Sequence, residues 1–216
     1  MKENIDNIIL MADVVDSRKA DQKMLLKNFK AVIEYANRKN KADLLSPMTI
    51  TLGDEFQSVI KNLAVGLNII IDIEERLIST RMDFKLRYVL LEGQIETPVN
   101  PKIGYGMMGS GLTASREYLE QLKKTKHRVC INIKDNKRSD ALGNAFIIFQ
   151  ELVDSWRMEK DYYIVTEFLK GLDYKKAAEK LDKERSLIWK REKSLRLQDY
   201  FAIKKIINYL GENGYR

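Results

Sequence analysis

The chain has 216 residues, of which 44% are hydrophobic and 32% are charged, with 11 Gly, 3 Pro and one Cys. This composition excludes the collagen-like, disordered and disulfide-rich classes and is typical of a globular fold that depends on apolar packing. The single Cys130 cannot form an internal disulfide, and the apolar runs are too short to span a bilayer. We therefore expect a cytoplasmic protein without membrane contact.

The formal net charge is +7, and it is spread unevenly along the chain. From residue 157 onward there are 15 Lys or Arg and 10 Asp or Glu, whereas residues 1–156 carry 23 and 21. The segment 183–196 alone holds six basic and two acidic residues. Concentrated positive charge favours a polyanionic partner, because neutralising phosphates releases condensed counterions. A solvated helix face is the alternative that charge alone leaves open.

The hydrophobic pattern of the first 134 residues predicts alternating strands and helices. Strands are expected at 8–11, 48–52, 55–60, 84–92 and 128–133, and helices at 21–39, 63–80 and 112–124. Gly53-Asp54 suits a tight hairpin between the second and third strands, and a further short strand is expected before the third helix. The order predicts an α+β fold with helices over one face of a mainly antiparallel sheet.

The residues after 133 carry no strand signal and predict a helical region. We expect two domains, residues 1–134 and 135–216, joined by a polar linker at 134–140. Helices are expected at 141–157, 162–170, 174–181, 185–197 and 200–210. The short helices on either side of a turn at 182–184 have the spacing of a helix-turn-helix, which we place at about 162–197.

Residues 171–181 of this pattern are similar to region 4 of sigma factors and to related transcription regulators. Ala177 and Ala178 are small, as the first helix requires where the second crosses it. The resemblance implies a module that binds duplex DNA. By position, the residues facing the groove would be Arg185, Ser186, Trp189 and Lys190, with Lys183 and Arg191 on phosphates. The alternative is a helical hairpin that packs on the core or forms a dimer.

Acidic residues stand at the end of the first strand and at the tip of the hairpin. If the hairpin lies beside that strand, these carboxylates converge at one sheet edge, where they could hold Mg or Mn. The following turn would offer amide hydrogens to a phosphate. The predicted metal ligands are Asp13, Asp54 and Glu55, and the predicted phosphate-binding residues are Val14, Val15, Ser17, Arg18 and Gly53. Taken singly, each acid could instead be an ordinary turn or capping residue.

Two of these motifs resemble the palm-type catalytic domain of class III nucleotidyl cyclases. Ala12-Asp13-Val14-Val15 and Gly53-Asp54 match the metal-binding pattern, and the segment 52–56 (LGDEF) resembles the Gly-Gly-Asp-Glu-Phe signature of diguanylate cyclases. The resemblance implies a ferredoxin-like core, a metal, a nucleotide or other phosphorylated ligand, and a homodimer.

The chain also departs from the cyclase pattern at residues that such enzymes use for turnover. Residues 48–52 lack the purine-selecting lysine. Thr113 stands where the family has Asn, and Glu117 stands near the position of the family's Arg, with Arg116 adjacent. Without a cation for the developing charge, turnover should be poor, so ligand binding without cyclisation is expected. An active cyclase or related two-metal phosphoryl-transfer enzyme remains an alternative.

Nearly the full chain resembles the SatD family of bacterial proteins. The residues that carry this resemblance are segments 12–18 (ADVVDSR) and 51–57 (TLGDEFQ) and the helix pair near the C-terminus. The resemblance implies no particular activity. The combined expectation is a DNA-binding regulator whose palm domain binds a metal and a phosphorylated ligand, and a second alternative is a protein-interaction module without an active site.

Overall fold

A five-stranded sheet forms the centre of the computed structural model, which describes residues 6–19 and 21–212. The strands are β1 (Asn7–Val14), β2 (Leu44–Ile50), β3 (Glu55–Ile60), β4 (Leu86–Gly93) and β5 (Val129–Asn132). Their order is β2-β3-β1-β4-β5, with β5 parallel to β4 and the other neighbours antiparallel. The predicted α+β class is confirmed, and the first four strands have the order of a ferredoxin-like core.

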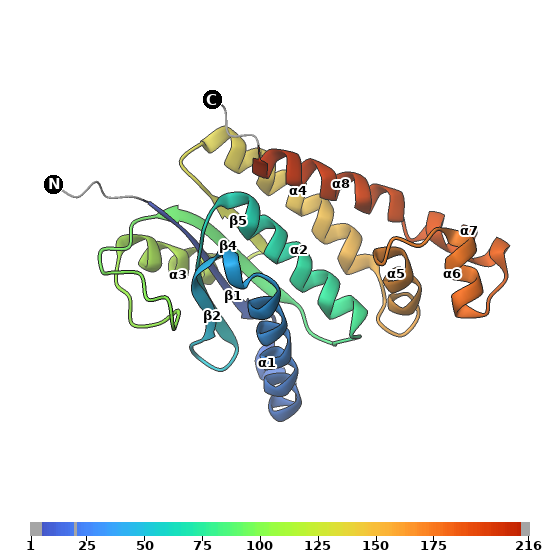
Figure 1. Cartoon of the computed structure of the whole chain (residues 1–216), viewed down its shortest axis with the longest axis horizontal. Coiled ribbons are helices and arrows are strands. Elements are labelled where there is room, and N and C mark those ends of the chain that lie inside the picture. The colour runs from blue at the N-terminus through green and yellow to red at the C-terminus, as the bar shows by residue number, and fades with distance from the viewer. Residues whose placement is uncertain (1–5, 20, 213–216) are drawn as a thin grey trace.

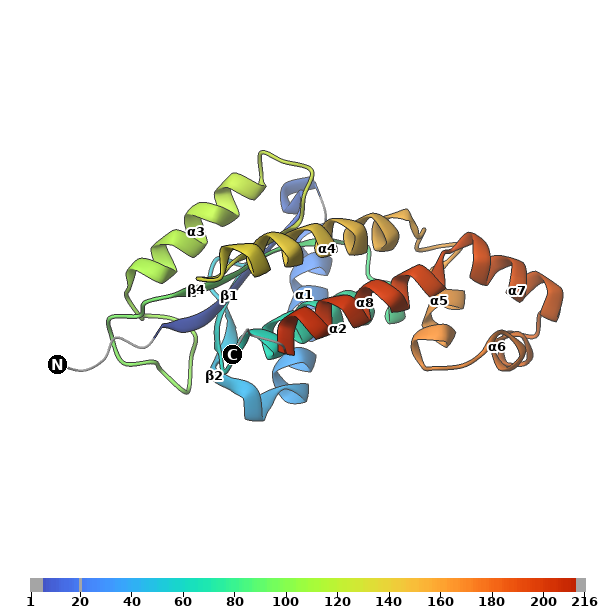
Figure 2. The ribbon, with the colours of Figure 1, turned by 90° about the horizontal axis from the view of Figure 1, so that it is seen from above.

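Helices cover both faces of the sheet (Figure 2). α1 (Gln22–Lys39) and α2 (Leu63–Ser79) lie on one face, and α3 (Ser110–Leu122) lies on the other. Leu10 of β1 belongs to the apolar cluster with α1 and α2, whereas Ile9 and Met11 belong to the cluster with α3. The prediction of helices over one face was therefore wrong. Both sets of alternating residues in β1 are apolar, so periodicity could not show which face each helix covers.

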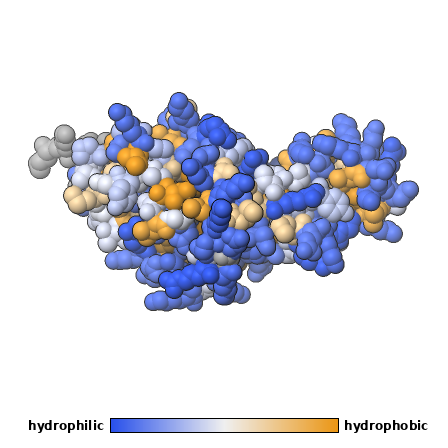
Figure 3. Space-filling model, turned by 90° about the horizontal axis from the view of Figure 1, so that it is seen from below, coloured by the Kyte–Doolittle hydropathy of each residue, from blue (hydrophilic) through white to orange (hydrophobic). Residues whose placement is uncertain are grey.

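The remaining helices follow β5 and divide into two groups (Figure 1). They are α4 (Asn136–Ser155), α5 (Tyr162–Leu169), α6 (Tyr174–Leu181), α7 (Arg185–Ser194) and α8 (Leu197–Glu212). α8 runs back along α2 and α4, whereas α5, α6 and α7 form a lobe at one end of the molecule, here called the α5–α7 lobe. Figure 3 shows this lobe as a smaller mass with a largely hydrophilic surface. One apolar cluster extends from the sheet through α4 and α8 to Ala177 and Ile188. The predicted division of the chain into two domains at residue 134 stays a prediction.

Several element boundaries differ from the predicted ones for local reasons. α4 begins at Asn136 because the Asp135 carboxylate caps it, accepting the N–H of Arg138. α7 ends at Ser194, and Arg196 adopts a left-handed φ of 53° between it and α8. No strand forms in residues 94–109, all of which are described.

Among the described residues, no helix combines the length and apolar character that crossing a bilayer requires.

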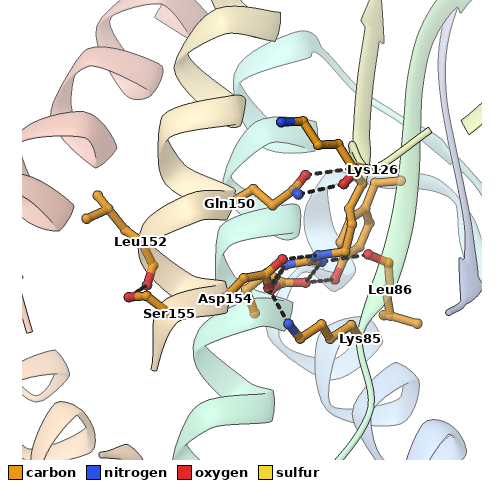
Figure 4. A network of polar contacts seen from close by, with 10 residues as sticks. Lys85, Leu86, Lys126, Gln150, Leu152, Asp154 and Ser155 are labelled. Atoms are coloured by element: carbon orange, nitrogen blue, oxygen red, sulfur yellow. Dashed lines mark hydrogen bonds and ion pairs between the residues drawn. The ribbon is translucent and has the colours of Figure 1, made fainter. Parts of the chain in front are cut away.

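A buried ion network joins the sheet to the helices (Figure 4). Arg128, which lies just before β5, donates to Glu74 of α2 at 3.0 Å and to Asp154 of α4 at 2.9 Å. Lys85 also contacts Asp154, at 3.0 Å, and the Tyr88 hydroxyl donates to Glu74. Burial alone would lower the pKa of Arg128, but the two carboxylates raise it above its ordinary value. The network therefore fixes the end of α4 that leads into the α5–α7 lobe.

Candidate functional site

The acidic residues predicted from the sequence do meet at one end of the sheet. The register places Asp13 of β1 directly between Glu55 of β3 and Arg87 of β4. Residues directly opposite one another in an antiparallel sheet point to the same face, so these three side chains form a row. They share the face covered by α3, since Lys123 and Arg116 of that region contact them. Sequence reasoning missed Arg87, although a basic residue in the apolar strand FKLRYVLLE was a signal.

Asp13 is held by two cations. Arg87 Nη1 donates to its Oδ1 atom at 3.2 Å, and Lys123 Nζ lies 3.3 Å from Oδ2. Burial raises the pKa of Asp13, and the two cations offset only part of that rise. The carboxylate is therefore already compensated by positive charge from β4 and from the end of α3.

Glu55 and Asp54 have different partners, although they are neighbours in the chain. Arg116 Nη2 donates to Glu55 Oε1 at 2.9 Å. The Ser17 hydroxyl donates to Asp54 Oδ2 at 2.5 Å, and the preceding Gly53 has a left-handed φ of 86° that allows the tight hairpin. The backbones of Asp54 and β1 are joined, because Val14 N–H donates to Asp54 C=O at 2.9 Å.

In this arrangement a divalent metal would have to displace the cations that are paired with Asp13 and Glu55. Metal ions of this class need several free oxygen ligands, whereas Asp13 and Glu55 are paired with cations. In the part of the chain that the structure describes, no three His, Cys, Asp or Glu residues gather as a metal group. Binding of Mg or Mn at these acids stays a prediction.

Two of the predicted amide donors in the turn after β1 already have backbone partners. Val14 N–H is bonded to Asp54 C=O, and Val15 N–H donates to Lys85 C=O at 2.9 Å. Neither group is available to a phosphate. Arg18 is exposed in this turn, and Ser17 uses its hydroxyl on Asp54.

The second predicted site lies in the α5–α7 lobe. α6 and α7 are joined by a three-residue turn whose first residue, Asp182, has a left-handed φ of 51°. Its N–H donates to the last carbonyls of α6, at Ala178 and Glu179. A left-handed residue after a short helix lets the chain turn sharply into the next helix, and Asp and Asn tolerate this conformation better than most residues. Asp182 thus takes the position at which such motifs often have Gly.

Packing fixes α7 against the rest of the lobe. Ala177, Ala178 and Ile188 are almost fully buried where α6 and α7 meet. Arg191 pairs with Asp161, a buried residue just before α5, and donates to Ser194 at 3.1 Å. The guanidinium of Arg191 anchors α7 to the lobe, and its predicted contact with a DNA phosphate stays a prediction. Sequence could not reveal this pairing, because the partner lies 30 residues away.

The outer surface of α7 carries most of the residues predicted to contact DNA. Lys183, Arg185, Ser186, Trp189 and Lys190 are all exposed. Lys193 is also exposed and lies over the Trp189 ring, 5.9 Å from its centroid. Arg185, Trp189 and Lys193 are spaced four apart and share one helix face. Sequence reasoning missed Lys193, although this spacing was visible.

Comparisons with solved structures return nucleotide cyclases. A bacterial light-regulated adenylyl cyclase has a TM-score of 0.44 and 12% identity over 59% of this chain and 43% of that chain. The guanylyl cyclase domain of the RhoGC fusion protein from the aquatic fungus Blastocladiella emersonii, as a double mutant, has a TM-score of 0.43 and 16% identity over 60% of this chain and 80% of that chain. This chain thus spans less than half of the adenylyl cyclase.

The sequence comparisons are more specific. No curated protein matches the chain. The model of the SatD family matches residues 7–210, nearly the whole sequence. The resemblance seen in the sequence is confirmed, and the chain belongs to the SatD family.

Proposed function

We propose that this protein is a DNA-binding regulator that inserts α7 into the major groove of duplex DNA. The observation that carries the proposal is the left-handed Asp182 turn between two short packed helices, the second of which exposes a basic face. In this kind of motif the second helix contacts base edges, and the first helix lies across the backbone.

The charge of the lobe supports a polyanionic partner. Residues 172–196 contain nine Lys or Arg and five Asp or Glu. Ion pairs occupy few of the cations near α7, and Lys183, Arg185 and Lys190 form no ion pair within the described residues. Lys183 and Lys190 are suited to phosphates, whereas Arg185 can bind a guanine edge with two hydrogen bonds.

The position of the lobe also supports docking on a duplex. α6 and α7 lie at the end of the molecule farthest from α3 and project beyond the sheet (Figures 1 and 2). A duplex could therefore approach α7 without meeting the body of the protein. A homodimer would place two such helices on two half-sites, but one lobe is sufficient for the contact itself.

Fluorescence anisotropy with a labelled duplex tests the proposal. Arg185→Ala plus Lys190→Ala should weaken binding at least tenfold, because it removes two exposed cations from the contact face. Lys27→Ala plus Lys30→Ala removes the same charge from exposed positions on α1 and is the matched control. Equal weakening by both double variants would indicate a general charge effect and would contradict a specific α7 interface. If the α7 double variant binds DNA as tightly as wild type but no longer binds a protein partner, the result would favour the alternative of a protein-interaction module.

Binding of a metal and a phosphorylated ligand at the sheet edge is a second candidate. The observation in its favour is that Asp13, Glu55 and the backbone of Asp54 are brought together there. Metal binding at this edge requires the carboxylates of Asp13 and Glu55 to break their ion pairs. Calorimetric titration of MnCl2 with ATP or GTP into wild type and Asp54→Asn tests this binding. Chromatography of the same mixtures tests phosphoryl transfer, and a wild type without binding or product would contradict both.

A further inference from the structure

A cavity of about 740 Å³ lies beside the paired acids, between the sheet and α3. β1 and β3 form its floor through Met11 and Gln57, α3 forms one wall, and residues 105–109 form another. Its volume is within the range of small-molecule sites, which are concave and mostly apolar with a few polar groups. The sequence patterns gave no indication of this cavity, because its walls come from four separate segments.

Gln57 is the unusual residue of the cavity floor. It stands opposite Met11 in the sheet and is only 6% exposed. Its side-chain amide makes no hydrogen bond to any residue in the described part of the chain. Neither amide atom of Gln57 is among the fully buried side-chain atoms that lack a partner in the described residues, so the amide is in contact with the open space of the cavity that Gln57 lines. Gln57 therefore offers one donor and one acceptor, side by side, to a molecule in the cavity.

The wall formed by residues 105–109 is fixed to the sheet. Gly104 N–H donates to Thr49 Oγ1 at 2.7 Å, and Met108 N–H donates to Thr97 Oγ1 at 3.0 Å. A Cβ on Gly104 would lie 2.5 Å from the Gln57 carbonyl oxygen, so the loop approaches the strand as closely as a backbone can. The cavity is therefore a formed feature with a rigid floor and a pinned wall.

The chemistry of the walls indicates the kind of ligand. Met11, Met107 and Leu112 make the interior apolar, and methionine sulfur packs well against aromatic rings. Glu117 stands on the rim beside Arg116, whose guanidinium is already paired with Glu55, so the rim offers no unpaired cation to an anionic ligand. An uncharged molecule avoids the cost of desolvating a charge against these walls.

We propose that this cavity binds an uncharged planar heterocycle with a lactam-like edge, whose adjacent donor and acceptor pair with the Gln57 amide. An amide side chain makes two parallel hydrogen bonds to such an edge, as Gln and Asn do with adenine. The cavity contains no residue of α7, so ligand binding there does not depend on DNA binding.

The probe is 2-quinolone, an uncharged planar lactam, compared with 1-methyl-2-quinolone, in which a methyl group blocks the donor. Titration of the full-length ¹⁵N-labelled chain by NMR should give saturable shifts at residues lining the cavity. We expect 2-quinolone to bind at least fivefold more tightly than its methylated analogue. In Gln57→Met this preference should vanish, whereas Gln121→Met, at an exposed position of α3, should keep it.

Two results would overturn the proposal. One is the absence of saturable shifts at the cavity with either probe up to 5 mM, a limit set by the weak binding of fragments of roughly ten heavy atoms. The other is equal affinity for the two probes in wild type, which would show that the Gln57 amide does not pair with the ligand. The comparison of probes is made on the wild-type chain, so it stands even where Gln57→Met does not fold.

Discussion

The acidic sheet edge and the surface of α7 carry similar numbers of charges but use them in opposite ways. At the sheet edge, Asp13 and Glu55 are buried and paired with cations from β4 and the α3 region. On α7, the side chains of Arg185 and Lys190 are exposed to solvent. Paired buried charges hold elements together, whereas unpaired exposed charges are available to a partner. The comparison explains why the α7 surface supports a function more directly than the acids do.

The buried side of this comparison is tested most strongly at Arg128. Arg128→Met should lower the free energy of unfolding by about 3–5 kcal/mol, because it leaves Glu74 without its buried partner. Denaturant unfolding followed by circular dichroism measures this change. Lys61→Met breaks a pair whose side chains are 60% and 42% exposed and should cost about 1 kcal/mol or less. Equal losses in the two variants would contradict the distinction between buried and exposed pairs.

The exposed side is tested at Trp189, which is 47% exposed. Trp189→Ala should weaken DNA binding roughly tenfold, about 1.4 kcal/mol, because the ring and Lys193 form part of the contact face. The stability of this variant should change by less than about 0.5 kcal/mol, since Trp189 is not one of the residues of the apolar core. Anisotropy and thermal unfolding on the same preparation separate the two effects. A large loss of stability would show that the Trp belongs to the core instead.

The turn between α6 and α7 gives a smaller effect. Asp182→Gly should stabilise the protein by about 0.5–1 kcal/mol, because glycine adopts a left-handed φ without steric cost. DNA affinity should stay within twofold of wild type, since the geometry of the turn is kept. Thermal unfolding checks the first expectation and anisotropy the second. Destabilisation by glycine would mean that the Asp182 side chain contributes contacts of its own.

The smallest effect concerns the pH dependence of Asp13. Its pKa in the folded protein is raised above the ordinary value of 3.8, so the folded state holds this proton more tightly than the unfolded state does. The Asp13 contribution to stability is therefore present at low pH and is lost as pH rises from about 4 through the raised pKa. As the pH rises through this range, the unfolding free energy of Asp13→Asn should increase relative to that of wild type. A difference in unfolding free energy that does not change with pH would contradict this account.

The sequence predicted most elements well, because each has a strong local signal. The hairpin at Gly53 and the helices on either side of Asp182 lie where turn residues and periodicity place them. The face covered by α3 was not predictable, because β1 is apolar on both sides. The first turn of α4 was missed because the cap at Asp135 lies in a segment that otherwise looks like a loop.

The candidate sites were predictable only as far as backbone position. The pattern placed Asp13 and the hairpin acids at one sheet edge, and the register confirms that Asp13 and Glu55 are adjacent. The partners of these acids, such as Lys123, come from segments far away in the chain. The same is true of Arg191 with Asp161 and of the cavity around Gln57. Pairings of this kind depend on tertiary packing, which no local pattern encodes.

The salt dependence of DNA binding tests the central claim most directly. Plotting the logarithm of the observed association constant against that of salt concentration gives a slope of about −0.9 for each phosphate contact. Arg185→Ala plus Lys190→Ala should make this slope shallower by up to about 2, whereas Lys27→Ala plus Lys30→Ala should leave it unchanged. A wild-type chain that does not bind duplex DNA, or an unchanged slope in the α7 double variant, would contradict the claim that α7 contacts DNA.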